Sequence, residues 1–339
     1  SERRNLTQRP KLSYEGIIDG SFSNEVESYL ADQYPARDIW VYLNSLQNRI
    51  LGIDYQNGIY RGKDGYLIQG FEKSEIDKED QKKQEILNSF LERNSQLQSY
   101  VMLVPTASWI LKDLLPSGAP QGDEKSWYES WLSISKISEL SNATVVDCAD
   151  ELAEAAKTNQ IYYRTDHHWT GLGAYYAYTA WAQAKGVDAH ALEEYEQVTF
   201  PGFTGSYYTE TQAAAMEANP DTVIAYKPLT CDRMTFTDTD GNTLNWPIIN
   251  DVSGYRSTQK YSCFAAGDQP FSYIENPNVT NGQACILVKE SYADAFVPYL
   301  TDHYQFIYWF DYREYNGNIT DRKSTRLNSS HSAKSRMPS

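Results

Sequence analysis

Apolar and polar positions along the chain follow two periods, one typical of helices and the other of buried strands. Residues 24–51 and 73–98 place apolar side chains every three to four positions, which predicts amphipathic helices. Pro35 interrupts the first segment, so two helices or one kinked helix are expected there. The inner face predicted for the second helix consists of Ile76, Ile86, Leu87, Phe90 and Leu91.

Short unbroken apolar runs, bounded by polar residues or proline, predict strands buried on both faces of a sheet. These runs are residues 100–104, 143–146, 161–163, 284–288 and 304–310. Helical segments are expected between them at 122–140, 171–185 and 292–300. Because parallel strands need crossover connections, this alternation predicts an α/β fold with a parallel sheet. Residues 57–70 and 200–282 carry short strands and turns instead, and the longer segment is interpreted as a β-rich insertion.

A polar cluster, Tyr-Arg-Thr-Asp-His-His-Trp-Thr at residues 163–170, follows one of the predicted strands. In parallel α/β sheets, sites form at the carboxyl ends of the strands. Asp166 lies two residues before His168, so its carboxylate can reach the imidazole in a tight turn and fix the tautomer of the ring. Adjacent histidines in a loop are otherwise often structural. Because three consecutive residues rarely face one ion, no metal is expected on Asp166, His167 and His168.

A second polar cluster lies at residues 288–294, where a strand is predicted to end and a helix to begin. There the unpaired backbone N–H groups and the helix dipole would favour a developing oxyanion next to Ser291. The ordinary alternative is that Ser291 is a helix N-cap. A nucleophile after one strand and an Asp-His pair after another form the arrangement that a serine triad requires. Ser291, His168 and Asp166 are therefore predicted to be catalytic, with Tyr163, Arg164 and Trp169 lining the substrate site; for Arg164 a structural salt bridge is the alternative.

The composition narrows the choice of partners. A net charge of -15 and a pI near 4.8 disfavour nucleic acid and anionic membranes, which an acidic surface repels. Twenty-seven tyrosines and eight tryptophans suit stacking on sugar rings, although most such side chains are expected to fill the core. Cys148, Cys231, Cys263 and Cys285 lack the spacing of a zinc or redox site, which leaves up to two disulfides or free thiols open.

Both ends of the chain differ from its central part. The sequence begins at Ser1 and contains no apolar run of the roughly 20 residues that span a bilayer, so any signal or anchor precedes this chain. Residues 321–339 are basic and Ser-rich, and they look like a translated sequencing adapter. The expected organisation is an N-terminal extension at 1–20, one domain at 21–320 and a non-native tail at 321–339.

Several motifs together resemble a known family. TDHHWT, KESYADAF followed by HYQFIYWFDYR, DQYPARD with GKDGYLI, and VMLVPT are similar to the bacterial DHHW family, which is related to the SGNH-hydrolase-like proteins of alginate O-acetylation. The resemblance covers roughly residues 20–320. Glu290 departs from the relatives, which more often carry Asp before the serine, and Gly267-Asp268 stands where they carry a Gly-Asn type pair that could supply an oxyanion donor.

The resemblance implies a flavodoxin-like, SGNH-type α/β/α fold and an extracellular or cell-surface location. It also implies O-acetyl transfer or removal on a surface polysaccharide or acetylated glycan by a Ser-His-Asp triad without a cofactor. Carried over by position, Asp166 orients, His168 is the base and Ser291 attacks. A membrane-bound acyl-transfer protein is the partner that such a reaction suggests. The alternative from another class is a catalytically inactive polysaccharide-binding or scaffold protein of the same fold.

Overall fold

The computed structural model describes Arg9, Phe22, Val26, Tyr29 and residues 37–51, 55–119, 122–212 and 220–315. The chain forms two compact units. Unit 1 contains the residues up to Ala189 together with 199–224 and 252–261, and unit 2 contains 190–198, 225–251 and the residues from Ser262 onward. The tail at 321–339, Pro35 and nearly all of the extension at 1–20 lie outside the described residues. The single domain at 21–320 stays a prediction.

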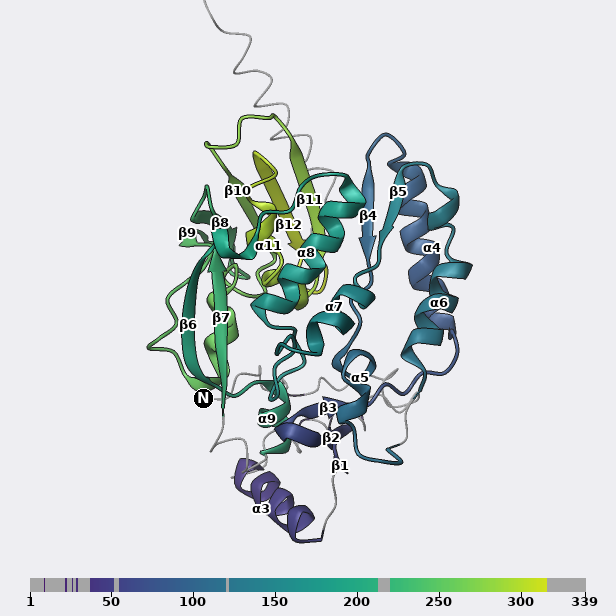
Figure 1. Ribbon diagram of the computed structural model, residues 1–339, viewed down its shortest axis with the longest axis vertical. Helices are drawn as coiled ribbons and strands as arrows, with labels where there is room; N and C mark the ends of the chain where they lie inside the picture. Colours follow the sequence, from purple (N-terminus) through teal and green to yellow (C-terminus); the bar gives the residue numbers. More distant parts are fainter. Residues whose placement is uncertain are drawn as a thin grey trace, which may run out of the picture. The chain divides into compact units, whose positions relative to one another are not determined.

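The core of unit 1 is a pair of parallel strands covered by helices on both faces (Figure 1). The strands are β4 (Ser99–Met102) and β5 (Ala143–Val146), and the helices are α4 (Lys78–Arg93), α6 (Glu124–Ile134), α7 (Ala149–Ala156) and α8 (Gly171–Lys185). Leu91 of α4 and Trp131 of α6 pack with Val101 and Val145 of the strands. Trp181 of α8 meets Tyr100 of β4 edge to face. The predicted strands at 100–104 and 143–146 and the helices around them are confirmed in this unit.

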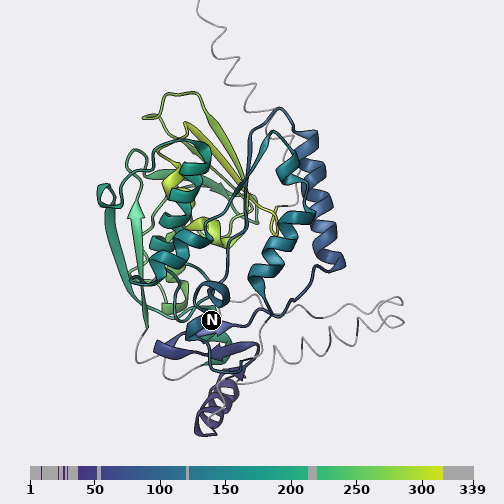
Figure 2. The same ribbon diagram turned by 45° about the vertical axis from the view of Figure 1, so that its right-hand side comes forward.

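Of the residues predicted for the inner face of α4, Leu87 and Leu91 pack in the core, as does Ile76 just before the helix, but the other two do not. Ile86 and Phe90 are 60% and 39% exposed, whereas Asp80 and Gln84 are buried. Gln84 Nε2 donates to the carbonyl of Trp131 at 2.7 Å, so a hydrogen bond to α6 replaces apolar contact at this point. The two helices lie side by side in the views of Figures 1 and 2, with their polar link buried.

The segment 161–170, which joins α7 to α8, is a tight turn. The strand predicted at 161–163 is wrong, because Tyr162 makes only an isolated bridge to Trp169. The Tyr163 N–H donates to the His168 carbonyl at 3.2 Å, and the Thr170 N–H donates to the Ile161 carbonyl at 2.8 Å. These bonds hold the two ends of the turn together and leave the residues between them at its tip. The Thr170 hydroxyl then caps α8 by accepting from the Gly173 N–H.

Shorter elements complete unit 1. The predicted strands and turn at 57–70 are confirmed as an antiparallel sheet of β1 (Tyr55–Gln56), β2 (Ile59–Arg61) and β3 (Leu67–Gln69), with η1 (Lys63–Gly65) at the turn. The other helices are α3 (Arg37–Ile50), α5 (Ala107–Ile110), η2 (Lys112–Leu114), η3 (Ile137–Glu139) and α9 (Ser206–Thr211). β6 (Glu196–Phe203) and β7 (Asp221–Lys227) pair with each other, and these two strands and η5 (Ser257–Cys263) each include residues of both units. The short helix η4 (Leu192–Glu194) belongs to unit 2.

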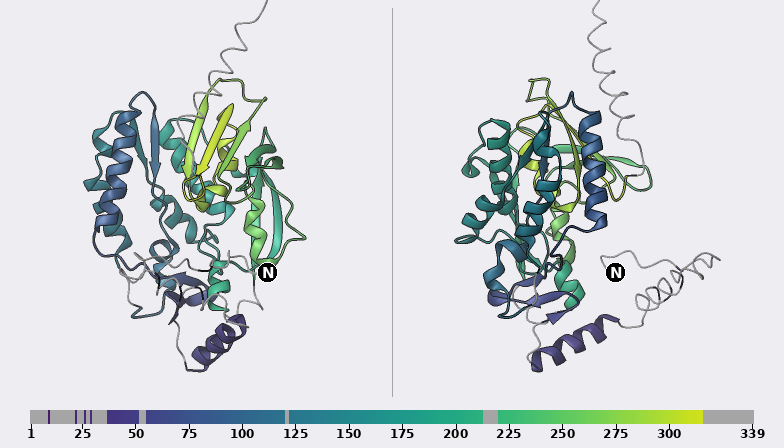
Figure 3. Two further views of the ribbon diagram at one scale, coloured as in Figure 1. Left: turned by 180° about the vertical axis from the view of Figure 1, so that it is seen from behind. Right: turned by 90° about the vertical axis from the view of Figure 1, so that its right-hand side faces the viewer.

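Unit 2 is built on a five-stranded mixed sheet in the order β11-β12-β10-β8-β9 (Figure 3). Its strands are β8 (Arg233–Thr237), β9 (Thr243–Pro247), β10 (Phe271–Glu275), β11 (Ala284–Lys289) and β12 (Phe306–Asp311). Only β11 and β12 are parallel in this sheet, in a register that places Lys289 beside Asp311. The β-rich character of 200–282 is confirmed, but three of its strands join β11 and β12 in one sheet. Two short helices follow β11, namely η6 (Ser291–Asp294) and α11 (Val297–Leu300).

The described residues thus form a mixed α/β structure with small sheets, and a single flavodoxin-like parallel sheet stays a prediction. All four cysteines are free thiols. Burial raises the pKa of the Cys148 thiol to about 12. Within the described part of the chain, the helices are too short or too polar for any of them to span a lipid bilayer.

Candidate functional site

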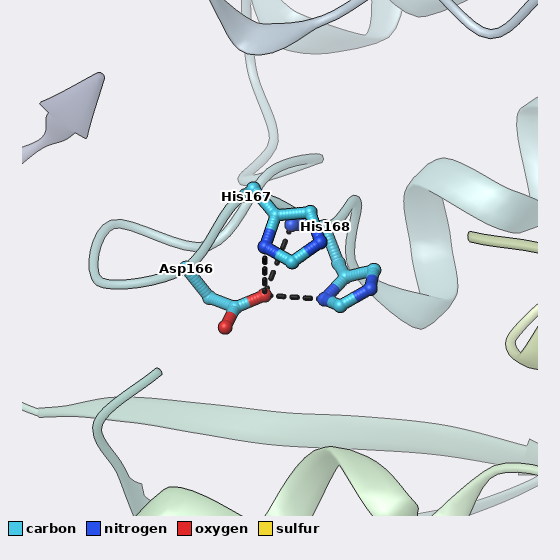
Figure 4. Close-up of side chains that lie close together, drawn as sticks. All are labelled: Asp166, His167 and His168. Carbon is cyan, nitrogen blue, oxygen red and sulfur yellow. Dashed lines mark hydrogen bonds and ion pairs between the residues drawn. The ribbon is translucent and has the colours of Figure 1, made fainter. Parts of the chain in front are cut away.

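The tip of the turn in unit 1 brings Asp166 and His168 into direct contact. Asp166 Oδ1 lies 2.5 Å from His168 Nδ1 and also accepts a hydrogen bond from the His168 backbone N–H at 3.0 Å. Figure 4 shows these contacts converging on one oxygen atom. An ionised carboxylate can only accept hydrogen bonds, so Nδ1 carries the proton and Nε2 is the basic nitrogen of the neutral ring. Both side chains are buried, Asp166 with 1% and His168 with 6% exposure.

The second oxygen of Asp166 is held by the first turn of α9. The Ser206 N–H donates to Oδ2 at 2.7 Å, and the Ser206 hydroxyl lies 2.9 Å from His167 Nδ1. The Thr165 hydroxyl accepts from the Gly205 N–H at 3.1 Å, which ties the same two segments together. The carboxylate is therefore fixed at both oxygens and cannot rotate away from the imidazole.

Aromatic rings restrict the orientation of the His168 imidazole. Tyr261 stacks on it with ring centroids 4.0 Å apart and an interplanar angle of 13°. The His167 ring lies 3.8 Å away at 36°. The sequence did not indicate Gly205, Ser206 or Tyr261 as site residues, because no local pattern connects them to a turn about 40 residues or more away.

The pKa of Asp166 is well below its usual range. Burial on its own would raise this pKa, but the charge and hydrogen bond of His168, the charge of His167 and the Ser206 N–H outweigh burial and lower it. The carboxylate is consequently ionised throughout the neutral range, as an acid that stabilises an imidazolium has to be.

Asp166, His167 and His168 are the group within the described residues whose ligand atoms could meet at a metal ion. Their ligand atoms lie within 4.8 Å of one another. Two ligands of one zinc ion at about 2 Å each lie roughly 3.3 Å apart in tetrahedral geometry. The 2.5 Å contact between Asp166 and His168 is shorter than that, and it uses the Nδ1 proton. The arrangement fits a hydrogen-bonded acid-base pair better than a metal site.

Gly205 leaves the space that the carboxylate of Asp166 occupies. A Cβ atom at position 205 would lie 2.2 Å from both Cβ and Oδ2 of Asp166, closer than real atoms approach. Gly205→Ala is therefore expected to lower the free energy of unfolding by about 1–3 kcal/mol, the usual range for overpacking.

Urea unfolding would measure the effect of Gly205→Ala. Gly254→Ala in the same unit is the matched control, because nothing lies within 4 Å of its added Cβ. Equal stability in the two variants would show that position 205 has more room than the structure gives it.

The three residues predicted to bind substrate are buried or paired inside the protein. Tyr163 and Trp169 are each 1% exposed, so neither presents surface to a substrate in this structure. Tyr163 packs edge-on against Phe203 in the interior. Arg164 Nε donates to the buried carboxylate of Asp221 at 3.0 Å, which is the salt bridge that the sequence left as its alternative role.

Ser291 lies in unit 2, at the first position of η6 directly after β11. Its place at a strand-to-helix junction agrees with the sequence prediction, and the residue is 6% exposed. Glu290 precedes the helix in extended conformation and makes no capping bond through its side chain.

A charged network, buried at three of its five residues, lies next to the turn that carries Ser291. This Lys289 cluster consists of Lys289, Asp268, Asp294, Asp311 and Arg313. Lys289 Nζ lies 2.5 Å from Asp294, 3.1 Å from Asp268 and 3.4 Å from Asp311, and Arg313 pairs with the last two. The carboxylate of Asp268 accepts from two cations, so within the Gly267-Asp268 pair only the backbone is left as a predicted oxyanion donor.

Two cations and three carboxylates leave the Lys289 cluster one proton short of neutrality. Burial, together with the charges of Asp268 and Asp311, raises the pKa of Asp294 to about 8, although its ion pair with Lys289 acts in the opposite direction. Desolvation disfavours the charged form of Lys289, but the surrounding carboxylates outweigh it and raise the pKa of that amine. Asp294 is thus mainly protonated at neutral pH, whereas Lys289 is charged.

The raised pKa of Asp294 makes the stability of the protein depend on pH. Between pH values near 4 and near 8 the folded protein holds a proton that the unfolded chain has released. Stability is therefore expected to fall as pH rises through this window, by up to about 1.4 kcal/mol per pH unit from this group. Asp294→Asn should remove that slope in urea unfolding curves. Asp302→Asn, a carboxylate-to-amide change in the same unit, should retain it, and an unchanged slope in Asp294→Asn would contradict the assignment.

Comparison with known proteins identifies the family. The family model described as DHHW protein matches residues 97–310, more than half of the chain. The crystal structure of a DHHW family protein from Eubacterium siraeum has 29% sequence identity and a TM-score of 0.68, over 80% of this chain and 88% of that chain. No curated protein matches the sequence significantly.

A more distant likeness extends to PatB1 from Bacillus cereus. Its structure has 19% identity and a TM-score of 0.64, over 80% of this chain and 92% of that chain. A second structure of PatB1, with a sulfonyl adduct, has 18% identity and a TM-score of 0.62. At these identities the likeness shows the fold alone. Together with the Asp166-His167-His168-Trp169 motif and the family match over its surroundings, these findings show that the chain belongs to the DHHW family.

Proposed function

We propose that this protein is a carbohydrate O-acetyltransferase or O-acetylesterase that acts on a surface polysaccharide outside the cell. Its catalytic residues are Ser291 as nucleophile, His168 as general base and Asp166 as the acid that orients the base. The proposal includes a flavodoxin-like sheet of the SGNH type, in which sites gather at the carboxyl ends of parallel strands. An N-terminal signal or anchor would carry the protein to its substrate.

The observation that carries the proposal is the geometry of Asp166 and His168. The carboxylate accepts from both Nδ1 and the backbone N–H of His168, and the Ser206 N–H fixes its other oxygen. A buried, ionised carboxylate on Nδ1 sets the tautomer in which Nε2 can take a proton, and it stabilises the imidazolium that results. A purely structural histidine pair has no need of this orientation.

In the proposed reaction, His168 Nε2 takes the hydroxyl proton of Ser291 while Oγ attacks the carbonyl carbon of an acetyl donor. The tetrahedral intermediate collapses with return of that proton to the leaving group, which gives an acetyl-enzyme. A sugar hydroxyl then repeats the sequence as acceptor in a transferase, and water does so in an esterase. Backbone N–H groups at the start of η6 would hold the oxyanion, and loss of one such donor typically costs about 3 kcal/mol in the barrier.

The partners follow from this chemistry. The acceptor or substrate is a surface polysaccharide or acetylated glycan, and a membrane-bound acyl-transfer protein would supply the acetyl group in a transferase. The large number of tyrosines and tryptophans, 27 and 8, suits contact with sugar rings.

Covalent labelling tests the nucleophile directly. An arylsulfonyl fluoride is expected to add one sulfonyl group per chain, located to Ser291 by peptide mass spectrometry, and to stop acetyl release from an aryl acetate. Heat-denatured protein is the control, because only an activated hydroxyl reacts quickly. Absence of labelling at Ser291, together with no acetyl release, would refute the proposed activity.

The inactive binding protein remains the competing function. It would be preferred if Asp166→Asn, His168→Asn and Ser291→Ala combined left glycan binding intact while no substrate was ever turned over. Isothermal titration with acetylated and deacetylated oligosaccharides gives this comparison.

A further inference from the structure

The turn that carries Ser291 has no side-chain helix cap and lies next to a buried lysine. Glu290 makes no capping bond through its side chain, and η6 is a single turn of four residues. So short a helix has little stability of its own, because its nucleation cost is not recovered. Something outside the helix has to hold the turn in place.

Lys289 is the residue that links this turn to its surroundings. Its side chain is fully buried, and Nζ meets the carboxylate of Asp294, the last residue of η6, at 2.5 Å. This ion pair therefore connects the residues on either side of the segment 290–293. Ser291 lies inside this closed segment.

The other bonds of Lys289 fix it to two neighbouring segments. Asp311, its register partner at the end of β12, lies 3.4 Å from Nζ. Asp268 lies 3.1 Å away and follows three consecutive residues with positive φ, namely Ala265, Ala266 and Gly267. Left-handed conformation costs an alanine roughly 1–2 kcal/mol, so the loop that precedes Asp268 is strained. Lys289 contacts the residue at which this loop ends.

We propose that Lys289 is a positioning residue, which sets the place of the Ser291 hydroxyl through its bond to Asp294. The inference rests on the proposed function in taking Ser291 as the nucleophile. Lys289 does not touch the reacting atoms in this account. It holds the backbone of Ser291 at one position relative to the ends of β11 and β12, and a neutral side chain at 289 would leave the turn without that anchor.

Lys289→Met is the variant that tests the proposal, because it keeps the length of the side chain and removes the charge. We expect kcat for an aryl acetate to fall by about 100-fold, the effect of a displacement of roughly 1 Å at a nucleophile, with KM within about twofold. Lys289→Arg retains the charge and can bond two carboxylates at once, so it should restore much of kcat. A residue that only stabilises the fold would not produce this split between kcat and KM.

Lys73→Met is the matched control. Lys73 also bridges two carboxylates, Asp77 at 2.9 Å and Asp80 at 2.8 Å, but it lies in unit 1, in the loop before α4. This variant should lose stability and keep kcat. If both variants folded and lost kcat equally, in proportion to their melting temperatures, the positioning role would be refuted. If Lys289→Met did not fold, Asp294→Ala takes its place, since it leaves Lys289 paired with Asp268 and Asp311.

Hydrogen exchange separates this inference from the proposed function. Loss of the anchor should speed amide exchange in residues 290–295 without a matching change across β10 and β12, whether or not the protein turns over an ester. If the unchanged protein turned over no ester while Lys289→Met showed faster exchange at 290–295, the anchor would be supported and the proposed activity refuted. Unchanged exchange in Lys289→Met would refute the anchor even in an active enzyme.

Discussion

Replacement of Ser291 by alanine is expected to reduce acetyl release on the order of 10⁶-fold, which leaves a residual rate about 10³–10⁴-fold above the uncatalysed one. The reason is chemical, because alanine offers no atom that can attack the carbonyl carbon or hold the acetyl group. Loss of one hydroxyl should change the free energy of unfolding by about 1 kcal/mol or less. Initial rates with an aryl acetate, corrected for spontaneous hydrolysis, measure the effect.

Ser272→Ala is the matched control for this change. Ser272 is a fully buried serine of β10 in the same unit, and its hydroxyl has no hydrogen-bond partner within the described part of the chain. This variant should keep full activity. Comparable rates for Ser291→Ala and the unchanged protein would leave Ser291 as a buried N-terminal residue of η6 without a chemical role.

Asp166→Asn should lower kcat by about 10⁴-fold while the protein stays folded. The amide nitrogen of asparagine would donate to Nδ1, which moves the proton of His168 to Nε2 and removes the base. The amide oxygen can still accept from one of the two backbone N–H groups, those of His168 and Ser206, so the turn should persist. Ester turnover across the neutral pH range, with circular dichroism to confirm folding, measures the result.

Asp302→Asn provides the comparison for Asp166→Asn. Asp302 is also a hydrogen-bonded carboxylate, which accepts from the N–H groups of Leu229 and Thr230 in unit 2. Its replacement should affect stability and leave turnover unchanged. A value of kcat for Asp166→Asn within tenfold of the unchanged protein would mean that His168 does not depend on this carboxylate as a catalytic base would.

Elements that carry their own boundary residues were predictable from the sequence. Helix α8 spans residues 171–185 as expected, because Thr170 caps its first turn and Gly186 ends it in the left-handed conformation. The contact between Asp166 and His168 was predictable for the same reason, since two residues in a tight turn meet without help from the rest of the chain. The family resemblance is confirmed by the match over residues 97–310.

Features that depend on distant segments were not predictable. The inner face of α4 was assigned from apolar residues alone, yet Gln84 is buried because its amide bonds to a carbonyl of α6. Lys289 looks like an ordinary surface charge in the sequence Lys-Glu-Ser, and only the fold shows that three carboxylates surround it. Whether the clusters of Asp166 and Ser291 act together stays a prediction.

The close approach of Gly205 to Asp166 has a use beyond this protein. Sequences that contain Asp-His-His-Trp can be sorted by the residue aligned with position 205, since any side chain there would occupy the volume of the acid. A glycine at that place marks chains that can seat the carboxylate against a helix start. A larger residue at that place marks chains in which the motif is present but the carboxylate cannot take this position. Such chains are the natural place to search for members that only bind.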